Sequence, residues 1–86
     1  MSDPAIVLYT VPDCRDCEAV KRLLRGAGRD WLEKDVRADP AAHAEMLRVS
    51  GVRIAPVVSI GEQVFWGPFD EQRPRLLAAL AQEKNP

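Results

Sequence analysis

The chain has 86 residues, which is enough for one small domain with a modest core, and we expect residues 1–86 to form a single domain. Its 12 basic and 13 acidic residues give a net charge of −1, so no basic excess favours binding to nucleic acid. No apolar run reaches the length of a membrane span, and residues 1–4 lack the features of a signal peptide. We therefore expect a cytoplasmic monomer that binds neither nucleic acid nor a membrane.

The first strand and helix place two cysteines at a junction. Residues from Ala5 to Tyr9 form an apolar run without polar alternation, which is typical of a strand buried on both faces. An amphipathic helix pattern follows, and Gly26 and Gly28 mark its end. Cys14 and Cys17 therefore lie at the junction between the first strand and the first helix.

The spacing of these cysteines favours redox chemistry. One helical turn brings sulfurs separated by two residues within disulfide range. A cysteine in the first turn also faces unpaired N–H groups and the positive end of the helix dipole, which favour the thiolate. The thiolate is the attacking species in disulfide exchange. In a cytosolic chain with a βαβ pattern, Cys14 and Cys17 are typical of a thioredoxin-like redox site.

Two other interpretations of the cysteines remain open. A structural zinc ion needs four ligands, and the chain offers only Cys14, Cys17 and His43 as cysteine or histidine ligands, so a carboxylate would have to complete the site. Alternatively, both cysteines are ordinary buried residues that pack as small apolar groups. Their position at a strand–helix turn argues against deep burial.

Charged neighbours are expected to tune Cys14. Asp13 is the predicted N-cap of the first helix. Arg15 favours the thiolate, whereas the carboxylates of Asp13 and Asp16 oppose it. The sequence therefore does not decide whether the pKa of Cys14 is raised or lowered by these charges. We expect no structural role for Asp16.

The middle of the chain completes a βαβ unit and adds a second helix. Residues from Trp31 to Val36 form a strand candidate whose polar middle suggests an outer position, and it should run parallel to the first strand. Asp39 and Pro40 open a helix that ends at Gly51. The apolar stripe of this helix comprises Ala42, Met46 and Val49.

The last third predicts a hairpin and a final helix. Strands from Val57 to Ile60 and from Gln63 to Trp66 flank a two-residue turn, so they should pair antiparallel. The final helix is capped by Asp70 or a neighbouring residue, and its apolar stripe includes Leu76, Leu77 and Leu80. The element order β-α-β-α-β-β-α predicts an α/β fold with a four-stranded mixed sheet covered by helices on both faces.

Three segments at these distances resemble the glutaredoxin branch of the thioredoxin superfamily. They are residues 9–17, which include the Cys-x-x-Cys pair, residues 55–58 (Ala-Pro-Val-Val) and residues 66–70 (Trp-Gly-Pro-Phe-Asp). The resemblance covers about residues 5–81, and it is strongest to the NrdH-type redoxins, the small hydrogen donors of ribonucleotide reductase. It implies a thioredoxin-like fold of the glutaredoxin type.

The resemblance also implies roles for individual residues. Cys14 is the nucleophile and Cys17 is the resolving cysteine. The bond between Ala55 and Pro56 is cis and places this loop beside Cys14. A proline there has no N–H group, and it leaves neighbouring backbone groups, including those of Val57, free to pair with an extended substrate.

Several positions depart from the glutaredoxin pattern or carry two interpretations. Val11 stands where many glutaredoxins have a lysine that helps to hold a glutathione carboxylate. Arg53 either replaces part of that charge or is a solvated loop residue. Asp70 either meets the amine of a small thiol or only caps the last helix. Trp66 and Phe69 either pack against the sheet or form an apolar docking patch.

The resemblance implies a dithiol–disulfide oxidoreductase that needs neither a metal nor a cofactor for the exchange step. Its expected partners are a disulfide-containing client protein and a reductant, which is either thioredoxin reductase or a small thiol such as glutathione. The lack of a cation at Val11 favours the reductase. A rival of another class is a binding module in which two chains share a metal or an iron–sulfur cluster through Cys14.

Overall fold

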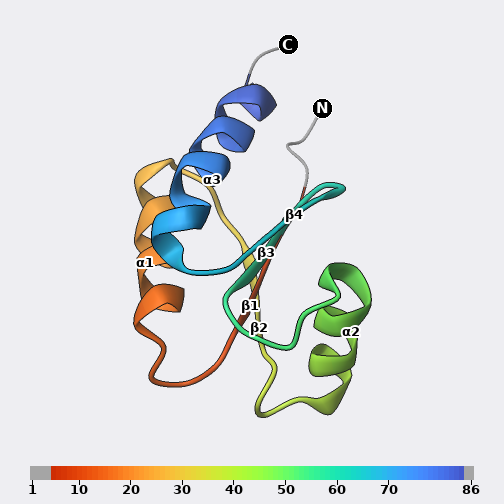
Figure 1. Cartoon of the computed structure of the whole chain (residues 1–86). Helices are drawn as coiled ribbons and strands as arrows, with labels where there is room; N and C mark the ends of the chain where they lie inside the picture. Colours follow the sequence, from red (N-terminus) through yellow and green to blue (C-terminus); the bar gives the residue numbers. More distant parts are fainter. Residues whose placement is uncertain (1–4, 85–86) are drawn as a thin grey trace.

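The computed structural model describes residues 5–84 and shows one mixed sheet with helices on both faces (Figure 1). The strands are β1 (Ile6–Thr10), β2 (Leu32–Asp35), β3 (Val57–Ile60) and β4 (Gln63–Trp66). The helices are α1 (Arg15–Gly26), α2 (Pro40–Ser50) and α3 (Phe69–Lys84). The predicted order of elements is therefore confirmed. The ends of β1 and β2 differ by one residue from those expected, whereas β3 and β4 have the predicted bounds.

The strand order in the sheet is β2-β1-β3-β4. Strand β1 pairs parallel with β2, where Tyr9 lies opposite Lys34, and antiparallel with β3, where Leu8 lies opposite Val58. Strand β3 also pairs antiparallel with β4. The polar strand β2 lies at an edge, as its composition predicts, whereas the apolar strands β1 and β3 form the centre of the sheet.

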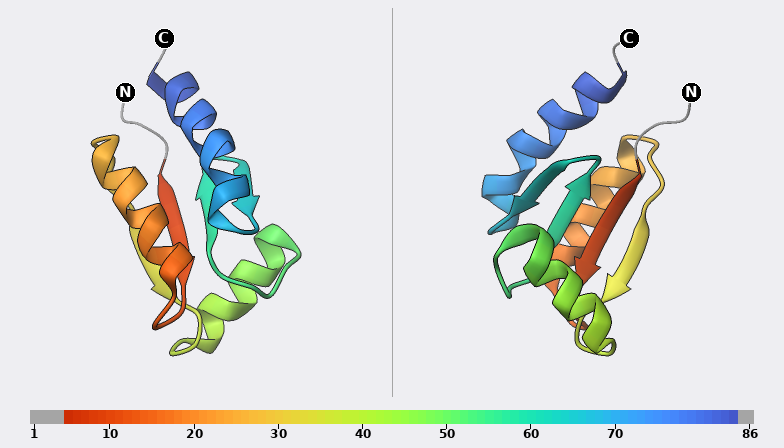
Figure 2. Two further views of the ribbon diagram at one scale, coloured as in Figure 1. Left: turned by 60° about the vertical axis from the view of Figure 1, so that its left-hand side comes forward. Right: turned by 90° about the vertical axis from the view of Figure 1, so that its right-hand side faces the viewer.

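Two apolar cores hold the layers together. Helices α1 and α3 pack on one face of the sheet and α2 covers part of the other face (Figures 1 and 2). The larger core joins the first face to both helices, through Leu8, Val20, Leu24, Val58, Leu76 and Leu80 among others. Complete burial of one such leucine contributes about 1.5–3 kcal/mol. This core fixes α1, which begins at the cysteines, against the sheet.

The ends of α2 follow the local sequence signals. Asp39 is the N-cap, and its Oδ1 accepts a hydrogen bond of 2.9 Å from the N–H of Ala41. Gly51 ends the helix with φ of 78°, a left-handed conformation that glycine adopts at low cost. Within the helix, Ala42 and Met46 are buried but Val49 is exposed. The predicted apolar stripe is therefore wrong at its last position, because α2 covers only part of its face of the sheet.

Helix α3 shows a similar difference. Leu76 and Leu80 are buried as predicted, whereas Leu77 is exposed and lines a groove between α1 and α3. Buried Ala79 completes the packed face instead. None of the helices in residues 5–84 has the length and apolarity needed to cross a membrane.

A polar link joins α2 to the sheet. The Tyr9 hydroxyl donates a hydrogen bond of 2.5 Å to Glu45, and Lys34 Nζ donates to both carboxylate oxygens of Glu45 at 2.9 and 2.7 Å. The hydrogen bonds from Lys34 and Tyr9 lower the pKa of Glu45. Burial and the bond to Glu45 raise the pKa of Tyr9, so its hydroxyl stays protonated and remains a donor. The link therefore connects β1, β2 and α2 through one carboxylate.

Candidate active site

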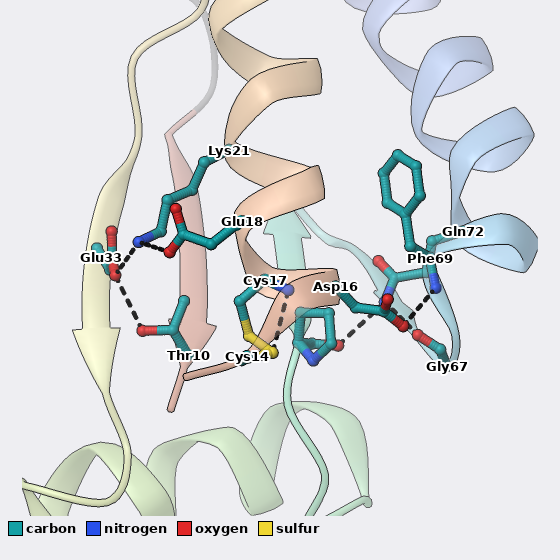
Figure 3. Close-up of a disulfide and its surroundings, with 11 residues drawn as sticks. Thr10, Cys14, Asp16, Cys17, Glu18, Lys21, Glu33, Gly67, Phe69 and Gln72 are labelled. Atoms are coloured by element: carbon teal, nitrogen blue, oxygen red, sulfur yellow. Dashed lines mark hydrogen bonds and ion pairs between the residues drawn. A yellow bond between two sulfur atoms is a disulfide. The ribbon is translucent and has the colours of Figure 1, made fainter. Parts of the chain in front are cut away.

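Cys14 and Cys17 form a disulfide at the start of α1, with their Cα atoms 5.2 Å apart (Figure 3). The side chain of Cys17 is 0% exposed, whereas Cys14 is only partly buried. An attacking sulfur can therefore reach Cys14 but not Cys17. The disulfide and the partial exposure of Cys14 contradict the interpretation of the pair as ordinary buried cysteines.

Cys14 is itself the N-cap of α1. Its Sγ accepts a hydrogen bond of 3.0 Å from the N–H of Cys17, and its backbone is extended. The predicted N-cap, Asp13, is wrong: this residue precedes the cap and has φ of 56° in the preceding turn. A hydrogen bond donated to sulfur stabilises the thiolate more than the thiol, so capping and activation of Cys14 use the same interaction.

An apolar groove lies next to the disulfide motif. It has a volume of about 410 Å³ and is lined by Asp16, Val52, Ile54, Ala55, Pro56, Trp66, Gly67 and Pro68. The bond between Ala55 and Pro56 is cis, as the family resemblance implies. Ile54 is 74% exposed and Trp66 is 51% exposed, which contradicts packing of Trp66 within the sheet layers. Phe69, by contrast, packs against the larger core.

Gln72 fixes the proline loop from behind, a role that sequence reasoning missed. Its side chain is 1% exposed, and its Nε2 donates to the carbonyl oxygens of Pro56 at 3.0 Å and Gly67 at 2.8 Å. The side-chain NH₂ group thus donates to both segments that line the groove, the proline loop and the turn after β4. The available signal was periodicity, because Gln72 lies one helical turn before buried Leu76 on the same face of α3.

Asp16 connects the dithiol motif to α3. Its Oδ2 accepts a hydrogen bond of 3.1 Å from the N–H of Phe69, the first residue of that helix. The expectation that Asp16 has no structural role is therefore wrong. Asp70 itself does not cap α3, because it lies inside the first turn. The carbonyl of nearby Pro68 accepts the N–H groups of Glu71 and Gln72, which agrees with the expectation of a cap at Asp70 or a neighbouring residue.

The remaining predicted site residues divide into two groups. Arg15 and Asp70 line a second groove, of about 480 Å³, whose lining comes from the first turns of α1 and the start of α3 and also includes Arg22. Val11 packs against the core under α2, and exposed Arg53 lies outside the residues that line either groove. Val57 is completely buried, so only its backbone can take part in binding. None of the described residues that line the apolar groove carries a positive charge in place of the lysine.

A second unpredicted network lies one turn after Cys17. Lys21 Nζ is 2.9 Å from carboxylate oxygens of both Glu18 and Glu33, and the Thr10 hydroxyl donates to Glu33 at 3.0 Å (Figure 3). The bonds to Glu33 and Glu18 raise the pKa of Lys21. Burial opposes ionisation of Glu33, but its hydrogen bonds from Lys21, Thr10 and Trp31 prevail and lower its pKa. The network anchors α1 to the edge strand β2.

Metal binding within one chain finds no donor set in the described region. Across residues 5–84, no group of three or more His, Cys, Asp or Glu side chains lies close enough to hold a metal ion. His43 lies in α2, on the opposite side of the sheet from α1. A cluster shared between two chains through Cys14 is a separate prediction that this geometry does not test.

Comparison with known proteins identifies the family. The family model described as Glutaredoxin matches residues 6–65. The chain is 41% identical over 69 residues to a glutaredoxin of Neisseria meningitidis serogroup A, covering 79% of this chain and 81% of the relative. It is 39% identical over 75 residues to the glutaredoxin-like protein NrdH of Escherichia coli K12, covering 87% of this chain and 86% of the relative.

The solved structures agree with the sequence comparison. The NrdH-redoxin of Escherichia coli superposes with a TM-score of 0.71 at 38% identity, covering 88% of this chain and 93% of that one. This similarity confirms the thioredoxin-like fold, and the disulfide supplies the redox pair that such proteins use. The chain therefore belongs to the glutaredoxin family and is a glutaredoxin-like thiol–disulfide oxidoreductase with a redox-active Cys14–Cys17 pair.

Proposed function

We propose that this protein donates electrons to protein disulfides and is itself reduced by thioredoxin reductase, in the manner of an NrdH-type redoxin. The observation that carries the proposal is the groove beside the disulfide motif, which presents exposed Ile54 and Trp66 and has no cationic side chain in its lining. Such a surface suits an apolar protein segment better than a small anionic thiol.

The exchange has two steps. The Cys14 thiolate attacks one sulfur of the client disulfide, that bond breaks, and the other client sulfur leaves as a thiolate and takes a proton. The Cys17 thiol then loses its proton and attacks Cys14 Sγ. This releases the second client thiol and closes the Cys14–Cys17 disulfide. Two electrons pass to the client in one cycle, and buried Cys17 acts only after the mixed disulfide has formed.

The proline loop is the proposed docking edge for the client. Pro56 has no N–H group to donate, and its carbonyl already accepts a hydrogen bond from Gln72. The backbone groups of Ala55, in contrast, make no hydrogen bond within residues 5–84. An extended client strand can pair with these groups while its apolar side chains contact Trp66.

The choice of reductant rests on charge. Val11 is apolar and packs under α2, and Arg53 is not among the residues that line the apolar groove, which argues against a cation there for a glutathione carboxylate. The solved relative is described as having a thioredoxin-like activity profile. By its likeness to NrdH, ribonucleotide reductase is the proposed client. Use of glutathione is the second candidate, because the Neisseria relative at 41% identity is named a glutaredoxin.

Parallel reduction assays test the proposal. Oxidised protein is mixed with NADPH and thioredoxin reductase in one assay, and with NADPH, glutathione and glutathione reductase in the other, with insulin as the disulfide client. We expect sustained NADPH oxidation only in the first assay, and none with Cys14→Ser. Faster turnover in the glutathione assay would favour the second candidate, and no insulin reduction in either assay would overturn electron donation to protein disulfides.

A further inference from the structure

Asp16, which lies between the two cysteines in the sequence, lines both of the grooves described above. It lines the apolar groove together with Ala55 and Pro56, and it lines the second groove together with Arg15 and Asp70. Figure 3 shows the side chain extending from the first turn of α1 toward the start of α3. A small molecule in the apolar groove therefore meets the negative charge of this carboxylate with no cation in the lining, whereas in the second groove it also meets the side chains of Arg15 and Arg22.

The same carboxylate occupies a position that would otherwise attract anions. Unpaired N–H groups and the helix dipole make the N-terminus of a long helix favourable for carboxylates and phosphates. Helix α3 has 16 residues, and the N–H of its first residue, Phe69, donates to Asp16 Oδ2 at 3.1 Å. The N–H groups of Glu71 and Gln72, two and three residues further along, already donate to the Pro68 carbonyl, so only the N–H of Asp70 is left beside the Asp16 carboxylate. A ligand carboxylate would have to displace Asp16 or approach beside its charge.

Nothing in the described region neutralises this charge by an ion pair. Arg15 is exposed, and no ion pair joins it to Asp16 within residues 5–84. Only one of the two carboxylate oxygens receives a hydrogen bond in that region. Asp16 therefore keeps its repulsion for an approaching anion while it accepts the hydrogen bond of the first N–H group of α3.

We propose that Asp16 is a specificity-determining residue that excludes anionic thiols from the Cys14–Cys17 disulfide. The inference deepens the proposed function and rests on it. The side-chain carboxylate of Asp16 accepts the hydrogen bond from the first residue of α3 that a carboxylate of a bound thiol could otherwise accept. Uncharged thiols and apolar protein segments are thereby favoured over glutathione, which carries two carboxylates and one ammonium group.

The reaction that reports on this selection is reduction of the protein by two small thiols. The first thiolate attacks Cys14 Sγ, the disulfide breaks, and Cys17 leaves as a thiolate and takes a proton. A second thiolate attacks the small-molecule sulfur of the mixed disulfide, so Cys14 is released and the two small thiols end as one disulfide. With dithiothreitol, both attacking sulfurs belong to the same uncharged molecule.

The test compares the rate constants for reduction by glutathione and by dithiothreitol at one pH. The variant is Asp16→Asn, which keeps an acceptor oxygen for Phe69 but removes the charge. The matched control is Asp13→Asn, which removes an equal charge next to Cys14 from a residue outside the lining of both grooves. Asparagine also tolerates the left-handed backbone of that position.

We expect Asp16→Asn to raise the glutathione rate relative to the dithiothreitol rate by about threefold, the factor for removal of one unit charge roughly 7 Å from another in water. Asp13→Asn should change that ratio less. In the unmodified protein, added salt should raise the same ratio because it screens the repulsion. This measurement does not depend on the folding of any variant.

Three results would overturn the proposal. They are an unchanged ratio in Asp16→Asn, an equal change in Asp13→Asn, and a ratio in the unmodified protein that does not respond to salt. These measurements follow reduction of the protein's own disulfide and need no client. Failure of the insulin assay would therefore remove the proposed function, whereas failure of the ratio test would remove only the role of Asp16.

Discussion

The amide of Gln72 donates a hydrogen bond of 3.0 Å to the carbonyl oxygen of Pro56, which joins the interior of α3 to the cis-proline loop. The same nitrogen donates to the Gly67 carbonyl at 2.8 Å. One buried side chain thus holds both the proline loop and the turn after β4. These two segments supply much of the lining of the apolar groove, so the shape of that groove depends on a residue outside it.

Replacement of Gln72 should therefore affect stability and client binding together. Gln72→Met has a similar volume but leaves the buried Pro56 carbonyl and the partly buried Gly67 carbonyl without this donor, and loss of a buried partner costs about 1–3 kcal/mol of unfolding free energy. Reduction of insulin should also slow, while reduction of the protein by dithiothreitol should change little. Urea unfolding and the two reduction assays measure these effects. Gln82→Met, at an exposed position of the same helix, is the control, and equal losses in both variants would contradict the assigned role.

The two cysteines should differ in accessibility and in role. Because Cys17 is completely buried and Cys14 is not, alkylation of the reduced protein should label Cys14 first, as peptide mass spectrometry can determine. Cys14→Ser should abolish disulfide reduction. Cys17→Ser should accumulate a mixed disulfide with the client, because no resolving thiol remains. Initial labelling of Cys17 would reverse the assignment.

The contact between Asp16 and Phe69 changes what a substitution at Asp16 should do to stability. Sequence alone predicts that Asp16→Asn leaves stability nearly unchanged. The structure instead predicts that Asp16→Ala, which removes the acceptor for the Phe69 N–H, destabilises the protein by about 1 kcal/mol, as loss of a helix cap does. Asp16→Asn should lose less, because its amide oxygen can still accept. Thermal unfolding of both variants tests this order, which equal melting temperatures would refute.

The link between Lys34 and Glu45 predicts a component of acid sensitivity. Hydrogen bonds from Lys34 and Tyr9 lower the pKa of Glu45 in the folded state below the value of about 4.3 expected for an unfolded chain. Its contribution to stability is therefore complete above that unfolded value and is lost as the pH falls through the lower folded value. Glu45→Gln should reduce stability at neutral pH and make the loss on acidification shallower.

Urea unfolding at a series of pH values measures this component. Glu62→Gln, at an exposed position in the β3–β4 turn, removes the same charge where no hydrogen bond is made, and it serves as the control. If Glu45→Gln and Glu62→Gln have the same dependence on pH, the link does not contribute.

Much of the fold could be predicted because its signals are local. Three features depend only on residues that are close in the sequence. They are the apolar run of β1, the two ends of α2 at Asp39–Pro40 and Gly51, and the two-residue turn between β3 and β4. Local backbone sterics and capping favour one conformation at each of these places. The Cys14–Cys17 spacing is local in the same sense, so the redox pair could be identified from the sequence.

The contacts that shape the site are not local. Asp16 meets Phe69 across 53 residues, Tyr9 meets Glu45 across 36, and Gln72 meets Pro56 across 16. Sequence reasoning missed all three partners and assigned the cap of α1 to Asp13 instead of Cys14. For α3 it named Asp70 or a neighbouring residue, and the structure shows that the neighbour Pro68 accepts the first helical hydrogen bonds.

Polar side chains such as these have several partners of suitable chemistry in the sequence. Which partner each one meets depends on how the helices pack on the sheet, and that packing is decided by burial of the apolar faces of all the elements together. The sequence by itself therefore determined the redox pair and the order of elements. Only the tertiary structure decided which charges and hydrogen-bond donors surround that pair.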